Sequence, residues 1–402
     1  MVIPFETPDF LRNPAAGTSY ISQIFFASGQ LSGVSVAQYF LENSYGDYQV
    51  TNGGVSDWVS LDKNLTDYIG FEGDDDLPRD VLELANINWP ALDVNNDHVI
   101  TPAEAQIVFL VANGYSAATR GFADYPADWV ISDPRPPEMS SLQANTPSGV
   151  FNFKPRVVYM GLKKANDPNF DTNPIRDLHS LCHELCHAFF NLTDRYLNGA
   201  CGTGGPGPYS IMSDNCSWEH MLIHDKMKIG WIQPKIVAGH LDKCLAFPAS
   251  ESSPTALVLL APQDPHQTDE YWIVENRHKP SSDCGSCVLN LPQFLGYNPG
   301  KVGVFDRDLP ESGLAVWWVK TGAYFSGYDD IRLVNASLPD QDPNGTTAIT
   351  GADPGYVNPI VGALFKRDDA DPQKLLLNSN GEWSLLFFRG VSDPGATMYA
   401  EF

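Results

Sequence analysis

Residues 181–196 read LCHELCHAFFNLTDRY, and the run from His183 to His187 within them decides how the chain is interpreted. Two histidines four positions apart on a helix lie on one face, where both imidazoles can bind one zinc ion. Glu184, between them, can reach a water on that metal and take its proton. The spacing therefore predicts a helix that carries two zinc ligands and a general base.

The sequence around this run favours such a helix. Asn173-Pro174 is typical of an N-cap followed by proline at the first helical position. Apolar residues then recur at three- and four-residue steps, at Leu178, Leu181, Leu185 and Phe189. We expect this stripe to pack into a core while the histidines face a cleft. The alternative is a surface helix whose histidines are four apart by chance.

The segment after the helix offers further site residues. Asn191 can adopt the left-handed conformation that ends a helix and reverses the chain. Asp194 follows a short turn later, as a candidate third ligand, because a catalytic zinc usually has three protein ligands. Met212 stands in a predicted tight turn after a glycine-rich loop. It is either an apolar floor beneath the histidines or an ordinary core methionine.

Several stretches, in order along nearly the whole chain, resemble the immune inhibitor A type of secreted zinc metalloprotease. They are SVAQYFLENSYGDYQV (35–50) followed by Trp58-Val59, ALDVNNDHVI (91–100), IVFLVANGY (107–115), HELCHAFFNLTDRY (183–196), SIMSDNCSW (210–218), KIGWIQP (228–234), EYWIVENRH (270–278), LPESGLAVWWV (309–319) and GVSDPGATMYAEF (390–402). The resemblance implies a zincin fold with a methionine turn and a zinc-dependent endopeptidase activity on protein or peptide substrates.

The resemblance also implies the ligand set His183, His187 and Asp194, with Glu219 as the alternative third ligand. Two features depart from the family. Glycine usually stands at the positions of Cys186 and of Phe190 or Asn191, and Asp194 lies eleven residues after His183 rather than ten.

This ligand set predicts a mechanism. Zinc would lower the pKa of a bound water to roughly 7, and Glu184 would accept its proton and deliver it to the leaving amine. Tyr196 is the candidate donor to the developing oxyanion, and His220 is another. A structural tyrosine and a surface histidine are the alternative interpretations of these two residues.

Zincins bind an extended peptide along an edge strand near the zinc helix. The strand candidates for this role are 156–161 and 107–114.

A second metal site is predicted at residues 93–104, which follow the twelve-residue calcium-loop pattern. The expected ligands are Asp93, Asn95, Asp97, the carbonyl of Val99, and Glu104. Position 6 of such loops is normally glycine, and here it is His98, which tolerates positive φ better than most residues. The alternative is a turn rich in Asp and Asn that binds no metal.

Composition bounds the class of protein. The 402 residues allow two or three domains, and 43% hydrophobic residues with 33 Gly and 31 Pro indicate a globular chain rich in loops. A net charge of −24 argues against a nucleic-acid partner, because phosphates would be repelled, and it favours the binding of cations. No run of eighteen apolar residues is present, so we expect no membrane span, and we expect a monomer.

Cysteines and glycosylation sequons bear on the compartment. Seven cysteines leave at least one unpaired within the chain. Cys201 and Cys216 are candidates for a disulfide that closes the loop around the methionine turn. Cys284 and Cys287 are expected to form a structural disulfide, either with each other or with another cysteine, whereas Cys182 and Cys186 are expected to be buried small residues. Asn-x-Ser/Thr sequons occur at Asn64, Asn191, Asn215, Asn335 and Asn344. We expect a secreted glycoprotein whose signal and any pro-segment lie upstream of Met1.

The predicted fold class is α+β, with a zincin-like catalytic domain over 1–236 and an antiparallel, jelly-roll-like β-sandwich over 237–402. Helices are expected near 35–44, 78–85 and 220–228. In the second part, short strands alternate with loops rich in Pro, Gly and Asp. Trp317 and Trp318 are expected in a core, and Glu275-Asn276-Arg277 is expected to form a structural ion pair.

Three functions are compatible with these patterns. The first is a secreted zinc endopeptidase. The second is a catalytically inactive zincin-fold protein that serves in binding or adhesion, for which the longer spacing to Asp194 would be the mark of decay. The third is zinc-dependent hydrolysis of a non-peptide substrate. An intact Glu184 favours an enzyme, because a binding protein does not need a general base.

Overall fold

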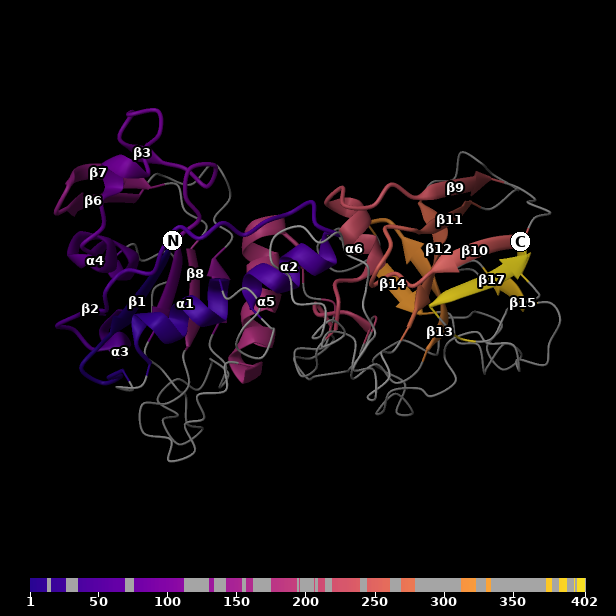
Figure 1. Ribbon diagram of the computed structural model, residues 1–402, viewed down its shortest axis with the longest axis horizontal. Coiled ribbons are helices and arrows are strands. Elements are labelled where there is room, and N and C mark those ends of the chain that lie inside the picture. Colours follow the sequence, from indigo (N-terminus) through magenta and orange to yellow (C-terminus); the bar gives the residue numbers. More distant parts are fainter. Residues whose placement is uncertain are drawn as a thin grey trace. The chain divides into compact units, whose positions relative to one another are not determined.

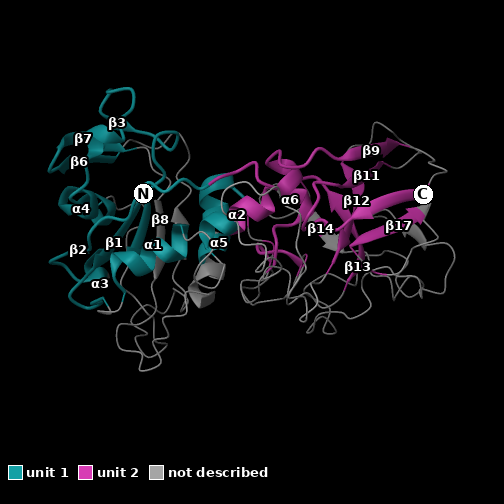
Figure 2. Ribbon diagram, in the orientation of Figure 1, with its two compact units in different colours: residues 1–38, 50–192 teal, residues 39–49, 193–402 magenta. Residues whose placement is uncertain are grey.

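The structure is a computed structural model that contains two compact units (Figure 2). Unit 1 comprises Met1–Gln38 and Val50–Leu192, and unit 2 comprises Tyr39–Gln49 and Thr193–Phe402. The described residues are 1–12, 16–26, 35–68, 76–111, 130–133, 142–153, 157–161, 175–193, 195, 206, 209–213, 219–238, 244–260, 269–278, 312–322, 330–333, 374–377, 383–388, 394 and 396–401.

Unit 1 is built on a five-stranded sheet with the order β2-β1-β4-β8-β5. Strands β1, β2 and β8 of this sheet are labelled in Figure 1. Its strands are β1 (Val2–Glu6), β2 (Val59–Ser60), β4 (Val108–Val111), β5 (Val130–Asp133) and β8 (Val157–Gly161). All neighbours are parallel except β5, which runs antiparallel to β8. Parallel strands covered on both faces are nearly continuous apolar runs, which explains the sequences VIPFE and VFLV.

Both strands predicted to line the substrate cleft lie inside this sheet. β4 pairs with β1 and β8, and β8 pairs with β4 and β5. Among the described strands, the edge next to them is β5, which was not predicted from the sequence. The central strand β4 has the sequence VFLV and is apolar throughout, as is typical of central parallel strands, whereas β5 ends in the polar residues Ser132-Asp133.

Helices and a small second sheet complete unit 1. The helices are α1 (Thr18–Phe26), the first residues of α2 (Val36–Asn43), α3 (Leu65–Tyr68), α4 (Asp76–Leu84), a 3-10 turn at Trp89–Ala91, and α5 (Ile175–Phe190). The small sheet has the order β3-β7-β6, from Val99–Ile100, Gly149–Phe153 and Leu142–Thr146. Its Phe151 and Phe153 enter the same core as Phe5, Phe109 and Trp89.

Unit 2 is centred on a sheet with the order β14-β13-β12-β11-β9. The strands of the unit are β9 (Lys235–Ala238), β10 (Cys244–Pro248), β11 (Leu257–Leu260), β12 (Glu270–Arg277), β13 (Gly313–Lys320), β14 (Asp330–Leu333), β15 (Lys374–Leu377), β16 (Trp383–Phe388) and β17 (Thr397–Glu401). β9 pairs in parallel with β11, whereas the other neighbours in the central sheet are antiparallel. β10 pairs with β17, and β15 pairs with β16.

Both faces of the central sheet of unit 2 are covered. Trp318 belongs to a cluster that contains Phe247 of β10 and Met398 of β17. Trp317, on the opposite face, belongs to a cluster that contains Tyr209 and Leu222. Trp317 is 0% exposed and Trp318 is 7% exposed, so the prediction that both tryptophans belong to a core is confirmed.

The segment from Tyr209 to Ile232, with helix α6 (Ile223–Lys228), therefore packs on a β-sheet that follows it in sequence. The predicted domain boundary at 236/237 would separate residues 209–232 from this sheet, whereas the structure places both in unit 2. The predicted zincin-like fold and β-sandwich stay predictions. Several individual elements agree with expectation, among them the helices α2 and α4 and the strands β4 and β8.

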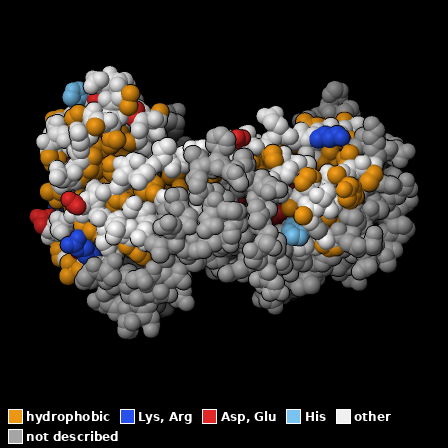
Figure 3. All heavy atoms as spheres, viewed as in Figure 1, with side chains coloured by type: hydrophobic (Ala, Val, Ile, Leu, Met, Phe, Trp, Pro, Cys, Tyr) orange, Lys and Arg blue, Asp and Glu red, His pale blue; other side chains and the backbone are white. Residues whose placement is uncertain are grey.

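The surface carries few large exposed apolar side chains among the described residues. Those of unit 1 include Leu84 of α4 and Val150 of β7, and hydrophobic side chains are visible over this part of the unit in Figure 3. No helix within the described ranges combines the length and the apolar character needed to cross a membrane.

Candidate metal centre

Helix α5 carries the two predicted zinc ligands. Leu181 and Leu185 are buried, as the apolar stripe predicted, and the helix ends at Phe190. Asn191 follows with φ of 54°, and its N–H still donates to the carbonyl of His187, at 2.9 Å. The prediction that Asn191 reverses the chain in a left-handed conformation is confirmed. His183 is 2% exposed and His187 is half-buried, so the histidine side of the helix is more enclosed than an open cleft requires.

The two imidazoles converge on one point. Their Nε2 atoms are 3.2 Å apart, and their rings stand at 82° to each other. Two nitrogens bound to one tetrahedral zinc at about 2.0–2.1 Å are about 3.3 Å apart, which matches this separation. The same distance suits a hydrogen bond between the rings, so the geometry fits zinc without requiring it.

A backbone carbonyl fixes the orientation of His187. Its Nδ1 lies 2.6 Å from the carbonyl oxygen of Leu192. An oxygen acceptor there requires the proton on Nδ1, which leaves the Nε2 lone pair of the neutral ring unprotonated. Metal-binding histidines usually have such an acceptor on their second nitrogen, because it sets both tautomer and ring orientation. The turn at Asn191 places this acceptor.

Three predicted residues of the zinc site lie outside the described part of the structure. Asp194 and Tyr196 lie outside the described residues, and so does the side chain of Glu184. Among the side chains that are described, no three His, Cys, Asp or Glu residues are grouped to hold a metal. The zinc site is therefore represented by two of its three predicted ligands.

The predicted tight turn that contains Met212 is confirmed, and it lies in unit 2. Ser213 N donates to the carbonyl of Ser210 at 3.0 Å, and Met212 is fully buried. Arg195 N donates to the carbonyl of Met212 at 2.8 Å, and Ile211 N donates to that of His220 at 3.3 Å. The turn is thus held from both sides, and a role as floor beneath the histidines stays a prediction.

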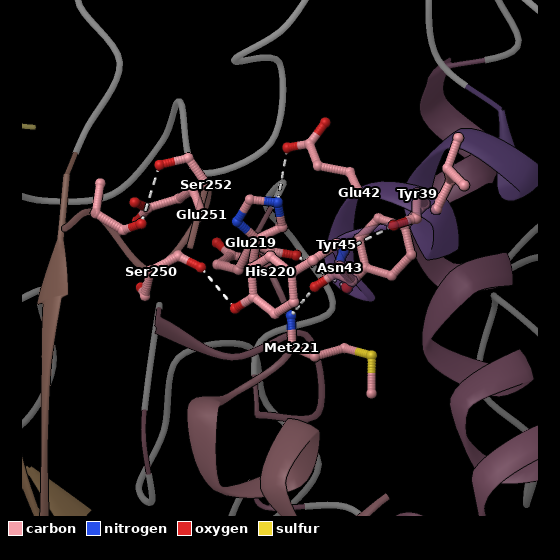
Figure 4. A network of polar contacts seen from close by, with 12 residues as sticks. Tyr39, Glu42, Asn43, Tyr45, Glu219, His220, Met221, Ser250, Glu251 and Ser252 are labelled. Carbon is pink, nitrogen blue, oxygen red and sulfur yellow. Dashed lines mark hydrogen bonds and ion pairs between the residues drawn. The ribbon is translucent and has the colours of Figure 1, made fainter. Parts of the chain in front are cut away.

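A buried polar network surrounds residues 219–221 in unit 2 (Figure 4). His220 Nε2 lies 2.8 Å from Glu42 Oε1, with both side chains buried. Met221 N donates to Asn43 Oδ1 at 2.8 Å, and the Tyr39 hydroxyl donates to the carbonyl of Glu219 at 3.1 Å. Because His220 is engaged inside the unit, its interpretation as a surface histidine is wrong.

The same network corrects the last predicted helix. Residues 219–222 are not helical, and α6 begins at Ile223 rather than at His220. Side chains of α2 bond to this segment, and such long-range contacts can override local helix preference. Glu219, the alternative third ligand, is fully buried within unit 2.

Unit 2 also contains a buried ion pair that sequence reasoning did not find. Arg195 Nε donates to Asp225 Oδ2 at 3.2 Å, and Nη2 donates to Oδ1 at 2.5 Å. Burial alone would raise the pKa of Asp225. The opposing Arg195 guanidinium and the neighbouring His224 outweigh burial and hold that pKa well below its usual range.

The predicted structural ion pair at Glu275-Asn276-Arg277 is confirmed. Arg277 lies 3.8 Å from Glu275 and 3.5 Å from Glu251, and all three side chains are buried. Arg277 Nη1 also donates to the carbonyl of Tyr209 at 3.1 Å. This bond ties β12 to the start of the methionine turn.

The backbone of the predicted calcium loop has the required reversals. Asn96 and His98 have φ of 57° and 61°, so His98 takes the conformation that favours glycine at position 6. Asp93 is buried and accepts hydrogen bonds from the N–H groups of Asp97 and His98, at 3.1 and 2.9 Å. Val99 N donates to Asp97 Oδ1 at 2.8 Å.

Glu104 closes this loop. Its carboxylate accepts from the N–H and hydroxyl of Thr101, and it lies near the amides of Val94 and Asn95. The bonds from Thr101 lower the pKa of Glu104 most, and burial opposes them. Glu104 Oε1 is buried without a hydrogen-bond partner among the described residues, as a carboxylate oxygen intended for a cation would be.

Cysteines and sequons are described only in part. Cys182 and Cys186 are buried, as predicted, and Cys244 is exposed. The cysteines predicted to form disulfides (Cys201, Cys216, Cys284 and Cys287) and the sequons at Asn215, Asn335 and Asn344 lie outside the described residues. Asn64 and Asn191 are exposed.

Comparison of the chain with protein-family models, with curated proteins and with solved structures finds no match. The residues of the site therefore carry the functional argument.

Proposed function

We propose that the chain is a secreted zinc-dependent endopeptidase with a zincin-like catalytic region. The observation that carries this proposal is the pair of imidazoles on α5, whose Nε2 atoms lie 3.2 Å apart while Leu192 holds Nδ1 of His187. His183, His187 and Asp194 would hold the metal. Bound zinc supplies polarisation of a carbonyl and lowers the pKa of a coordinated water to roughly 7.

The other steps use side chains of the chain itself. Glu184 accepts a proton from water and delivers it to the nitrogen of the departing amine. Tyr196 donates a hydrogen bond to the carbonyl oxygen as negative charge develops on it. The Leu192 carbonyl keeps His187 in one tautomer throughout.

The sheet of unit 1 supports a peptide as substrate. β5 lies at the end of the strand order, and α5 packs against β5 and β8. An extended peptide can add to such an edge through backbone hydrogen bonds, next to the helix that carries the histidines. Protein or peptide substrates therefore fit this unit better than a small non-peptide ester or amide.

The test is zinc content and casein cleavage of the purified chain beside Glu184→Gln and His187→Ala. We expect one zinc per chain, cleavage that phenanthroline abolishes, and a Glu184→Gln variant that keeps zinc but loses activity by a factor of at least about 100. His187→Ala should lose both. Zinc without cleavage in any of the proteins would support the inactive binding protein instead, and a natural chain that binds no zinc would overturn the proposal.

We also propose that residues 93–104 bind calcium through Asp93, Asn95, Asp97, Val99 and Glu104. The support is the pair of left-handed residues, the return of Glu104 to the start of the loop, and its buried oxygen. β3 at the end of the loop pairs with β7, so a bound cation would stabilise the small sheet.

A further inference from the structure

Among the described strands, β6 lies at the end of the small sheet of unit 1, whose order is β3-β7-β6. Its sequence, LQANT, contains no charged residue, no proline and no glycine. Edge strands of natural proteins are often protected by charges or proline, because an open row of N–H and C=O groups can pair with a strand of another molecule. The protection of β6 therefore has to come from outside the strand.

Helix α4 packs against β6 (Figure 1) and bonds to its backbone. Arg79 Nε donates to the carbonyl of Gln143 at 3.3 Å, and Asn145 N donates to Glu83 Oε1 at 2.9 Å. Gln143 and Asn145 are two residues apart, so these backbone groups point the same way, away from β7. Val81 anchors the helix in the core that β6 and β7 share.

The two side chains of α4 reproduce what a neighbouring strand would offer. Arg79 supplies a donor and Glu83 an acceptor. These residues are four apart on the helix, a rise of about 6 Å, whereas Gln143 and Asn145 are two apart on the strand, a rise of about 6.8 Å. The helix therefore occupies the outer edge of β6 with the spacing of a strand.

The same strand of a second copy of the chain fits this edge. In an antiparallel pair centred on Ala144, the Asn145 N–H of each copy faces the Gln143 carbonyl of the other. Gln143 and Asn145 are exposed, and they would lie opposite each other, where their side-chain amides can hydrogen-bond. No like charges meet, because β6 is uncharged. Such a contact is two-fold symmetric, so it closes at the dimer.

We propose that α4 masks a dimer interface: Arg79 and Glu83 occupy the edge of β6 and prevent it from pairing with β6 of a second copy. Both side chains are half-buried, and each bonds to a backbone group that the second copy would need. The masked edge lies within unit 1 and does not involve zinc, so it can be tested whether or not the chain is a peptidase.

The decisive variant is Arg79→Ala/Glu83→Ala, which removes both partners of the edge and leaves a good helix former at each position. Lys63→Ala/Asp80→Ala is the matched control. It also removes one cation and one carboxylate, which form an ion pair of 2.9 Å in unit 1, and Asp80 belongs to α4. Neither variant changes the net charge.

A third substitution locates the interface. Asn145→Pro, added to Arg79→Ala/Glu83→Ala, removes the N–H that the second copy would use. Proline is tolerated in an edge strand where the N–H faces away from the neighbouring strand, as that of Asn145 does. This variant should lose the dimer and keep the fold.

Sedimentation velocity at increasing protein concentration measures association, and circular dichroism with the thermal unfolding midpoint shows that each variant is folded. We expect the natural chain and Lys63→Ala/Asp80→Ala to stay monomeric. The mass of Arg79→Ala/Glu83→Ala should approach twice that of the monomer, and Asn145→Pro should return it to the monomer.

A folded Arg79→Ala/Glu83→Ala variant that stays monomeric would overturn the proposed mask. Association that Asn145→Pro leaves unchanged, or that the control shares, would overturn it as well. If the double variant does not fold, Glu83→Ala alone decides: a dimer that Asn145→Pro suppresses supports the mask, and a monomer overturns it.

Discussion

Asn191 ends α5 in a backbone conformation that residues with a Cβ rarely adopt, with φ of 54°. Glycine takes this conformation without strain and asparagine tolerates it, whereas alanine does so at a cost of about 1–2 kcal/mol. We therefore expect Asn191→Ala to be about 1 kcal/mol less stable than Asn191→Gly, measured by urea unfolding. Thr193→Val is the control, since it also removes the sequon but leaves the backbone at 191 unchanged. Equal stability of the Ala and Gly variants would contradict the prediction.

Asp225 gives the molecule an acid-sensitive contribution to stability. Its pKa is lower in the folded protein than in the unfolded chain, so the folded state resists taking up the proton. This contribution is complete above the unfolded pKa of about 3.9 and declines as the pH falls below that value toward the lower folded pKa.

The measurement is the free energy of unfolding of the natural chain and of Asp225→Asn between pH 6 and pH 2.5. Asparagine does not ionise, so we expect the variant to be less stable at pH 6 and the difference to shrink as the pH falls below about 4. A difference that stays constant across this range would show that the ionised carboxylate is not the stabilising species.

At the residue scale, the features that could be predicted from the sequence are those set by residues close to one another in the chain. The helical spacing of His183 and His187, the reversal at Asn191 and the burial of Cys182 and Cys186 all follow from positions within one turn of each other. The partner of Arg195 lies thirty residues away, and the partner of His220 lies 178 residues away. No short window of sequence contains those pairs, so periodicity could not find them.

At the scale of elements, the predicted calcium loop gives the clearest test. A cation that binds only the folded state stabilises it by RT ln(1 + [Ca²⁺]/Kd), which is about 2.7 kcal/mol at a hundredfold excess over Kd. We expect calcium to raise the unfolding midpoint of the natural chain and to have a much smaller effect on Glu104→Gln.

Two controls make that test specific. Magnesium, titrated over the same range, should have little effect, because it prefers a smaller octahedral site. Glu83→Gln removes a carboxylate that accepts from Asn145 N in the same unit, outside the loop, and it should keep the response to calcium. An unaltered calcium response in Glu104→Gln would remove Glu104 from the ligand set.

The elements themselves were predicted unevenly. Strand and helix positions followed from the local sequence pattern, as in α2, α4 and β4. The order of strands did not, because a parallel sheet is assembled by crossovers whose destinations no local pattern specifies. For that reason the edge strand β5 was missed, and two central strands were chosen in its place.

For the whole molecule, the cluster around Trp317 makes residues 237–402 necessary to the segment that precedes them. A chain that stops at Pro234 would expose Tyr209, Leu222 and Ile223, which are buried against the central sheet of unit 2. Each large side chain exposed in this way loses about 1.5–3 kcal/mol of stabilisation. We expect the 1–234 chain to be aggregated or protease-sensitive and to show no casein cleavage.

The comparison is limited proteolysis and near-ultraviolet circular dichroism of the 1–234 chain beside the full chain. Trp317→Leu in the full chain is a milder version, with an expected loss of about 2–4 kcal/mol in the free energy of unfolding. A soluble, protease-resistant 1–234 chain with its own cooperative transition would instead establish the division at 236/237. The alternation of turn-rich and apolar segments located that division in sequence, but the packing partner of each segment is visible only in three dimensions.

The contact between Glu42 and His220 also has a consequence for synthesis on the ribosome. The two residues are separated by 178 positions, and at about 5–20 residues per second roughly 10–35 s pass between their appearances. During that interval Tyr39, Glu42 and Asn43 have been translated, but their partners at 219–221 have not. Until then these side chains of α2 lack their native partners, so this part of unit 2 can reach its final packing only after residue 221 has been synthesised.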